Sequence, residues 1–138
     1  MKLAGKKLIF NLLLIFILIP LNSFKIGGQN PVKEKPYMIV AQMPQFPGGK
    51  HALNRYIREN LTYPFEALKH NIQGKVNVEF VVAKDGTLTE IRTVGTKLGY
   101  GLEEQAVKIF QKMPKWIPGK QDGIAVPVYM MLPIVFSI

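Results

Sequence analysis

Hydrophobic positions divide the chain into two regions of different pattern. Near the N-terminus, residues 8–21 form an almost unbroken apolar run after a short lysine-bearing segment. After a polar stretch rich in glycine and proline, apolar residues recur at the intervals of helices and strands. We therefore expect a separate N-terminal segment over residues 1–28, a linker over 29–42 and one folded domain over 43–138. Within the linker, the short apolar run from Tyr37 to Val40 is a candidate for an extra edge strand.

Three elements of the domain have a clear period. Apolar residues at helical spacing predict one helix from about Gly49 to Asn60 and another that begins at Leu102 and is stopped by Pro114. Between them, every second residue from Val76 to Val82 is apolar, which predicts a strand that opens at Gly74. A shorter helix is expected after the Tyr63-Pro64 pair, because proline is favoured in the first turn of a helix.

Two further strands complete the expected sheet. Asp85-Gly86 predicts a two-residue hairpin turn and a return strand from Thr87 to about Gly95. The apolar positions of that strand alternate regularly only if a bulge lies near Thr89-Glu90. The last strand is expected from Ala125 to Ile138, where every second residue is again apolar.

The directions of these strands determine the fold class. A helix joins the second strand to the last, so these two run parallel, and in an antiparallel sheet the last strand must pair with the first. We expect an α+β fold, a two-layer sandwich in which a three-stranded antiparallel sheet of order 2-1-3 carries helices on one face. The last strand is then an edge strand.

Two prolines on the last strand indicate which side of it faces outward. Pro127 and Pro133 lack an N–H group and have the same parity, so both gaps fall on the side that has no neighbouring strand. Tyr129 and Met131 share that parity, and we expect their N–H and C=O groups to be free for an outside partner.

Charge and composition exclude several classes of function. The formal net charge is +9, and four lysines that precede any plausible fold leave +5 for the rest, with acidic residues interspersed. This scattered charge is more typical of a soluble basic domain than of a protein that binds nucleic acid or an anionic membrane surface. The chain has no cysteine, which excludes disulfides, thiol catalysis, thiolate metal sites and bacterial lipoprotein anchoring.

An enzyme is not indicated. His51 and His70 are the only histidines, and their positions at helix ends predict surface residues rather than metal ligands. No catalytic triad order, phosphate-binding glycine loop or metal-ligand spacing is present. Trp116 is expected to pack in the core rather than to serve as a stacking platform. We therefore expect no catalytic residue, no metal site and no cofactor.

The N-terminal apolar segment has two interpretations. A helix over residues 8–21 would span about 21 Å, short of the ~30 Å hydrocarbon layer, which favours a cleaved signal peptide. However, no Ala-x-Ala cleavage pattern is present, and extension to Phe24 reaches the lower limit of a membrane span between Lys7 and Lys25. Both alternatives place the domain outside the cytoplasm, in the periplasm, either released or anchored to the inner membrane.

From about Met43 to Ile138 the chain resembles the C-terminal domain of the TonB family. Each short motif is weak, but their order and spacing together are specific. The residues that carry the resemblance are Phe46-Pro47-Gly48-Gly49, Tyr63-Pro64 with Ala67, Ile72 to Val78, Phe80-Val81-Val82, Asp85-Gly86, Leu102-Glu103-Glu104 with Ala106, Met113-Pro114-Lys115-Trp116 with Pro118-Gly119, and Leu132-Pro133-Ile134 with Phe136.

The resemblance implies a two-layer fold and a transport function. Familiar members work with ExbB- and ExbD-type motor proteins at the inner membrane and pass energy to outer-membrane receptors. They grip a short receptor peptide by strand addition at the edge of the sheet. Carried over here, this mode predicts a peptide-binding site at Val128, Tyr129, Met130, Met131 and Leu132, and less specifically at Asn60.

One departure leaves an alternative open. Familiar transducers carry a long proline-rich spacer, whereas the stretch from Lys25 to Met43 spans at most about 65 Å when fully extended. A periplasmic peptide-binding adaptor without energy transduction is therefore the alternative. An open sheet edge also allows a homodimer by strand exchange.

Overall fold

A three-stranded antiparallel sheet of order β2-β1-β5 forms one layer of the fold, as the sequence predicts. The computed structural model describes residues 33–138; the expected N-terminal segment lies outside these residues. The central strand β1 (Gly74–Val82) pairs with β2 (Leu88–Val94) on one side and with β5 (Val128–Phe136) on the other. The predicted bulge is present in β2, where Glu90 adopts a positive φ of 54°.

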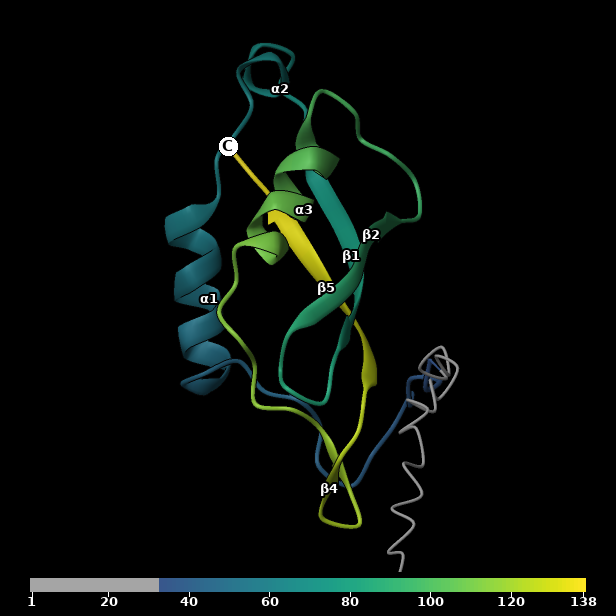
Figure 1. The fold of residues 1–138 in the computed structure, drawn as a ribbon. Coiled ribbons are helices and arrows are strands. Elements are labelled where there is room, and N and C mark those ends of the chain that lie inside the picture. The colour runs from purple at the N-terminus through teal and green to yellow at the C-terminus, as the bar shows by residue number, and fades with distance from the viewer. Residues whose placement is uncertain (1–32) are drawn as a thin grey trace, which may run out of the picture. The chain divides into compact units, whose positions relative to one another are not determined.

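The helices form the second layer. The helix α3 (Leu102–Gln111) packs across β1 and β2, and α1 (Gly49–Asn60) lies beside it near β5, as Figure 1 shows. A short helix, α2 (Phe65–Lys69), connects α1 to the sheet. No helix among residues 33–138 is long and apolar enough to cross a lipid bilayer.

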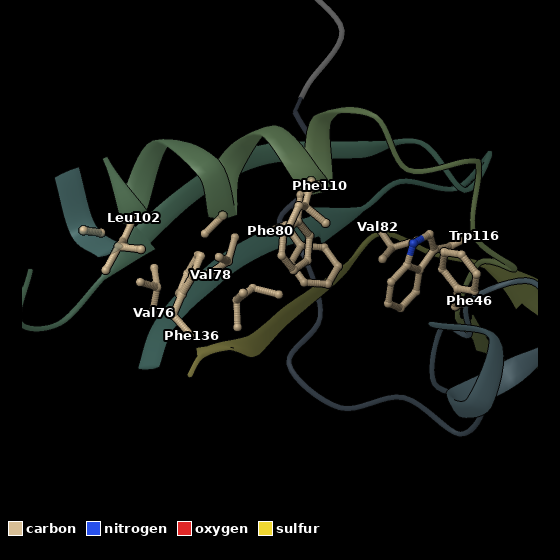
Figure 2. Close-up of a cluster of buried hydrophobic side chains, with 13 residues drawn as sticks. Phe46, Val76, Val78, Phe80, Val82, Leu102, Phe110, Trp116 and Phe136 are labelled. Atoms are coloured by element: carbon tan, nitrogen blue, oxygen red, sulfur yellow. The ribbon is translucent and has the colours of Figure 1, made fainter. Parts of the chain in front are cut away.

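The core lies between the two layers and has an aromatic corner at one end. Side chains on the inward face of β1, among them Phe80, meet the apolar stripe of α3, and the rings of Phe80 and Phe110 lie 4.9 Å apart (Figure 2). Trp116 is 4% exposed and packs edge-on against Phe46 at 5.8 Å and Phe80 at 5.4 Å. Its indole N–H has no hydrogen-bond partner among the described residues, so packing holds the ring. The expectation that Trp116 is a core residue is confirmed.

Two local elements differ from their predictions. The hairpin turn between β1 and β2 has three residues, Lys84 to Gly86, because only Gly86 takes positive φ while Asp85 accepts hydrogen bonds from Thr87 N–H and Oγ1. The last strand begins at Val128 rather than Ala125. Residues before it form a separate small hairpin, β3 (Lys120–Gln121) and β4 (Ile124–Ala125).

The folded unit begins nearer the N-terminus than the sequence predicts. Residues 33–42 were expected to be linker, yet they belong to the same compact unit as the rest of the domain. Gln42 exchanges two backbone hydrogen bonds with Lys120, at 3.0 and 2.9 Å, and Val40 is buried against Val126 and Val128. This apolar contact, whose one local signal is the short apolar run from Tyr37 to Val40, overrides the linker pattern of glycine, proline and charge.

The turn at Gly86 sets the position of the aromatic corner, and we predict that Gly86→Ala destabilises the fold. Gly86 has a φ of 86°, its C=O accepts from the N–H of Trp116 at 2.8 Å, and an added Cβ would lie 1.9 Å from the Trp116 carbonyl oxygen. We expect a loss of about 3–4 kcal/mol in the free energy of unfolding, measured by urea titration.

Gly123→Ala is the matched control for this substitution. Gly123 has a similar φ of 75°, but nothing lies within 4 Å of an added Cβ. Only the backbone strain of about 1–2 kcal/mol then applies. Equal losses for the two variants would show that the contact with Trp116 is unimportant.

Candidate functional site

The outer edge of β5 is the peptide-binding site that the sequence predicts. In the register of the β1–β5 ladder, Val78 lies opposite Leu132 and Glu79 opposite Met131. Backbone groups of a strand alternate in direction, and the Tyr129 N–H points away from β1 toward another segment. The odd-numbered residues of β5, including Pro133, therefore face outward, as the sequence predicts, and Pro127 directly precedes the strand with the same parity. We call the outward backbone groups of residues 127–135 the β5 edge.

Part of the β5 edge is already occupied. The Tyr129 N–H donates to the Tyr37 carbonyl oxygen at 2.8 Å, and the Tyr37 N–H donates to the Pro127 carbonyl oxygen at 2.9 Å. This corrects the expectation that both Tyr129 and Met131 present free groups. Among residues 33–138, no backbone or side-chain hydrogen bond reaches the outward groups of Met131, and its side chain is 54% exposed.

An apolar hollow adjoins the β5 edge on the helical side of the sheet. Met130 and Leu132, whose side chains point toward the helices, contribute one wall, and Leu53 of α1 contributes another. Phe46 and Trp116 from the aromatic corner also line it. These side chains come from four parts of the chain, and the hollow is shaped to receive apolar atoms.

The helix α1 runs alongside β5 and brings positive charge to it. Lys50 lies at the rim of the apolar hollow, and Arg58, two turns further along α1, lines a second hollow against the end of β5. Asn54 lies between them on the same helical row. The groove between α1 and β5 is thus apolar at its base and flanked by two cations.

The predicted binding residues have different surroundings in the structure. Val128 is fully buried, Met130 and Leu132 line the apolar hollow, and Tyr129 and Met131 lie on the opposite, open face of the sheet. Their backbones form one continuous edge even though their side chains point to two faces.

Asn60 is not part of this arrangement. It is the last residue of α1, its side-chain amide donates to the Tyr56 carbonyl oxygen at 2.8 Å, and it lines a separate hollow with residues of α3 such as Lys108. The structure therefore does not bring Asn60 together with the β5 edge.

A charged cluster marks the open face of the sheet next to the edge. Arg92 donates to Oε2 of Glu79 from Nε at 2.9 Å and from Nη2 at 2.8 Å. The Tyr129 hydroxyl, followed by the Arg92 guanidinium, lowers the pKa of the Glu79 carboxyl. Glu79 in turn raises the pKa of both the Tyr129 phenol and Arg92. The cluster ties the side chain of Tyr129 to the central strand.

Sequence reasoning missed the apolar hollow, whereas it offered the segment of Tyr37 as a candidate edge strand. Helical spacing marked Leu53 as inward, but no local pattern could join it to Trp116 and Met130. For Tyr37, the only available signal was the short apolar run from Tyr37 to Val40 in an otherwise polar stretch. Within residues 33–138, no group of three or more His, Asp or Glu side chains is arranged to hold a metal ion.

One protein family matches most of the domain. The family described as "Gram-negative bacterial TonB protein C-terminal" matches residues 59–138. Two solution NMR structures of the Helicobacter pylori TonB C-terminal domain are similar to the chain. The shorter has 24% identity and a TM-score of 0.49, and the match covers 63% of this chain and 90% of that one. The longer has 23% identity and a TM-score of 0.48, with 67% and 86% covered. No curated protein matches the chain.

The lowered pKa of Glu79 gives a pH-dependent prediction. The pKa of Glu79 is lower in the folded chain than in the unfolded chain. Its contribution to stability is therefore fully present at a pH above the unfolded-state pKa and is lost as the pH falls through the folded-state pKa. We expect Glu79→Gln to destabilise the domain at neutral pH, by an amount that shrinks below about pH 4.3. Urea titrations of both proteins at several pH values measure this.

Tyr129→Phe serves as the specific control for the same cluster. It removes the hydroxyl that contributes most to the shift, so the pKa of Glu79 should move up toward its ordinary value while the Arg92 pair remains. An unchanged Glu79 pKa, followed by NMR of the side-chain carboxyl, would contradict the assigned cause.

Proposed function

Since this chain belongs to the TonB C-terminal family, we propose that it couples inner-membrane energy to outer-membrane receptor transport by gripping a receptor peptide at the β5 edge. The observation that carries the proposal is an edge strand whose outward groups lie beside an apolar hollow. The members of this family are transport-related domains, and a peptide-binding function, rather than a catalytic one, is consistent with that.

The geometry of the edge supports strand addition. An extended peptide laid along β5 would exchange backbone hydrogen bonds with outward groups such as those of Met131, which gives affinity for any sequence. Selectivity would come from a side chain that enters the hollow lined by Met130 and Leu132. Lys50 and Arg58, which flank the groove, favour acidic groups on the peptide.

The proposed binding residues follow from this arrangement. Tyr129 and Met131 supply outward backbone groups, Met130 and Leu132 supply one wall of the hollow, and Val128 holds the start of the strand in the core. Asn60 remains a separate proposal, because its hollow lies between the end of α1 and α3.

The proposed partners extend beyond the receptor peptide. Energy transfer would require a motor of the ExbB and ExbD type and an anchor in the inner membrane, with the domain in the periplasm. A homodimer by exchange across the β5 edge is a further proposed state.

One observation favours the alternative, a periplasmic adaptor without energy transduction. With residues 33–42 held on the domain, only residues 29–32 remain of the expected linker, at most about 14 Å when fully extended. Such a short connection does not carry a domain across the periplasm.

We predict that Met131→Pro abolishes peptide binding without unfolding the domain. The substitution removes an outward N–H but none of the ladder bonds to β1. Synthetic peptides from the periplasmic N-terminal segments of outer-membrane receptors of the same bacterium serve as probes in fluorescence anisotropy. We expect at least about a tenfold rise in Kd.

Thr93→Pro is the matched control, since it removes an outward N–H from the opposite edge of the sheet. Thr93 pairs with Val78 on the side of β1 that faces β2, and the alternation of the ladder directs its N–H away from β1. Equal loss of binding in both variants, or full binding by Met131→Pro, would contradict the placement of the site.

The state of the N-terminus separates the two functions. If the chain transmits force, we expect the uncleaved mass, from Met1 onward, in the inner-membrane fraction, because force requires an anchor. Intact mass spectrometry of the membrane and periplasmic fractions measures this. A cleaved chain found free in the periplasm would exclude direct energy transfer and leave the adaptor.

A further inference from the structure

The N-terminal arm, residues 33–42, occupies the beginning of the β5 edge. Tyr37 forms a parallel bridge with Val128: its N–H donates to Pro127 and its C=O accepts from Tyr129. A strand added in parallel makes the same pair of hydrogen bonds. The arm therefore contacts the sheet in the way that a bound peptide would.

The arm is held on both sides of Tyr37. On the N-terminal side, Lys33 pairs with Glu90 and Glu34 pairs with Lys84, both at the surface. On the C-terminal side, the buried Val40 anchors the arm against the domain. Ile39, between these anchors, is 83% exposed, so the arm leaves the edge directly after Tyr37.

With the arm in place, little of the edge remains for another strand. The outward N–H of Tyr129 donates to the Tyr37 carbonyl oxygen, and Pro133 has no N–H group. Between them, Met131 keeps an outward N–H and C=O that are both without a hydrogen bond, and beyond Pro133 the same holds for Val135. Within residues 128–132 this leaves one residue, which is too short a ladder for specific capture of a peptide.

We propose that the arm is an internal competitor that must leave the β5 edge before a peptide pairs with residues 128–132. This inference rests on the proposed function of that edge. The arm resembles a ligand in direction and bonding, so the peptide it excludes is one that runs parallel to β5 and offers a non-proline residue in place of Tyr37.

The contacts of the arm are strong enough to block the edge and weak enough to release it. Two backbone hydrogen bonds and two exposed ion pairs favour the docked arm over the released arm by roughly 10- to 100-fold. Occupancy by the arm weakens the apparent affinity for a peptide by the same factor, because only the open fraction binds.

Release of the arm has a second consequence for reach. Residues 33–39, which precede the buried Val40, would add about 24 Å of extended chain to the connection between the domain and residues 1–32. Tension applied through that connection acts on Lys33 and Tyr37 before it acts on the sheet. Pulling would therefore open the binding edge and lengthen the spacer together.

The test compares Tyr37→Pro with Ile39→Pro in the full-length chain in detergent. Tyr37→Pro removes the N–H that donates to Pro127, whereas the Ile39 N–H makes no hydrogen bond to the described residues. The first readout is hydrogen exchange at the Tyr129 amide. We expect roughly 10- to 100-fold faster exchange in Tyr37→Pro and no change in Ile39→Pro.

The second readout is binding of a synthetic peptide with the sequence of residues 35–40, Lys-Pro-Tyr-Met-Ile-Val. It should bind Tyr37→Pro roughly 10- to 100-fold more tightly than the unaltered chain or Ile39→Pro. The inference is overturned if the Tyr129 amide of the unaltered chain exchanges as fast as the Met131 amide. It is also overturned if release of the arm in Tyr37→Pro leaves the affinity for the peptide unchanged.

A charge exchange tests the arm without touching the edge. Lys33→Glu places two carboxylates against each other at Glu90 and should raise peptide affinity a few-fold, and the addition of Glu90→Lys should reverse the gain. Suppose that the receptor peptides bind Met131→Pro as tightly as the unaltered chain, while the exchange of the Tyr129 amide and the binding of the arm peptide behave as expected. The proposed receptor function then fails, and the competition by the arm stands.

Discussion

The register of β5 against β1 is the constraint on which the rest of the structure depends. Pro127 and Pro133 cannot donate to a ladder, so the strand fits beside β1 only with its odd-numbered residues facing outward. A slip of one residue would put both prolines into the ladder and would also turn Ile134 and Phe136 out of the core. Two independent penalties therefore enforce one register.

That register decides what the edge can offer to a partner. It aims the backbone groups of Tyr129 and Met131 outward and the side chains of Met130 and Leu132 toward α1. Backbone recognition and side-chain recognition are thereby placed next to each other on one strand. The aromatic corner around Trp116 supplies the far wall of the hollow, so the packing that stabilises the domain also shapes its binding groove.

The same edge is a liability when it is unoccupied, because a free strand edge pairs with any other edge that it meets. The arm reduces this exposure through Tyr37, while the prolines limit how far any ladder can extend. Protection and recognition thus use the same hydrogen-bonding groups. A segment that shields the edge at rest must compete with whatever the edge binds, and its modest contacts keep that competition reversible.

The sequence by itself determined the helices, the three strands of the main sheet with their order, and the outward face of β5. Strict alternation in β1, the stripe of α3 and the parity of two prolines are local properties, and local geometry turns them into structure directly. The Asp85-Gly86 turn was located correctly, but its length was not, because Asp85 accepts two hydrogen bonds from Thr87 and stays out of positive φ.

Tertiary structure decided which of these features meet. The hollow joins residues as distant in sequence as Phe46 and Leu132, and no periodicity encodes a contact between them. The arm shows the reason most clearly: glycine, proline and charge predicted a linker, yet burial of Val40 and two backbone bonds at Tyr37 hold it on the domain. The local pattern of residues specifies the secondary structure of a segment, whereas only the assembled tertiary surface specifies which other segments it contacts.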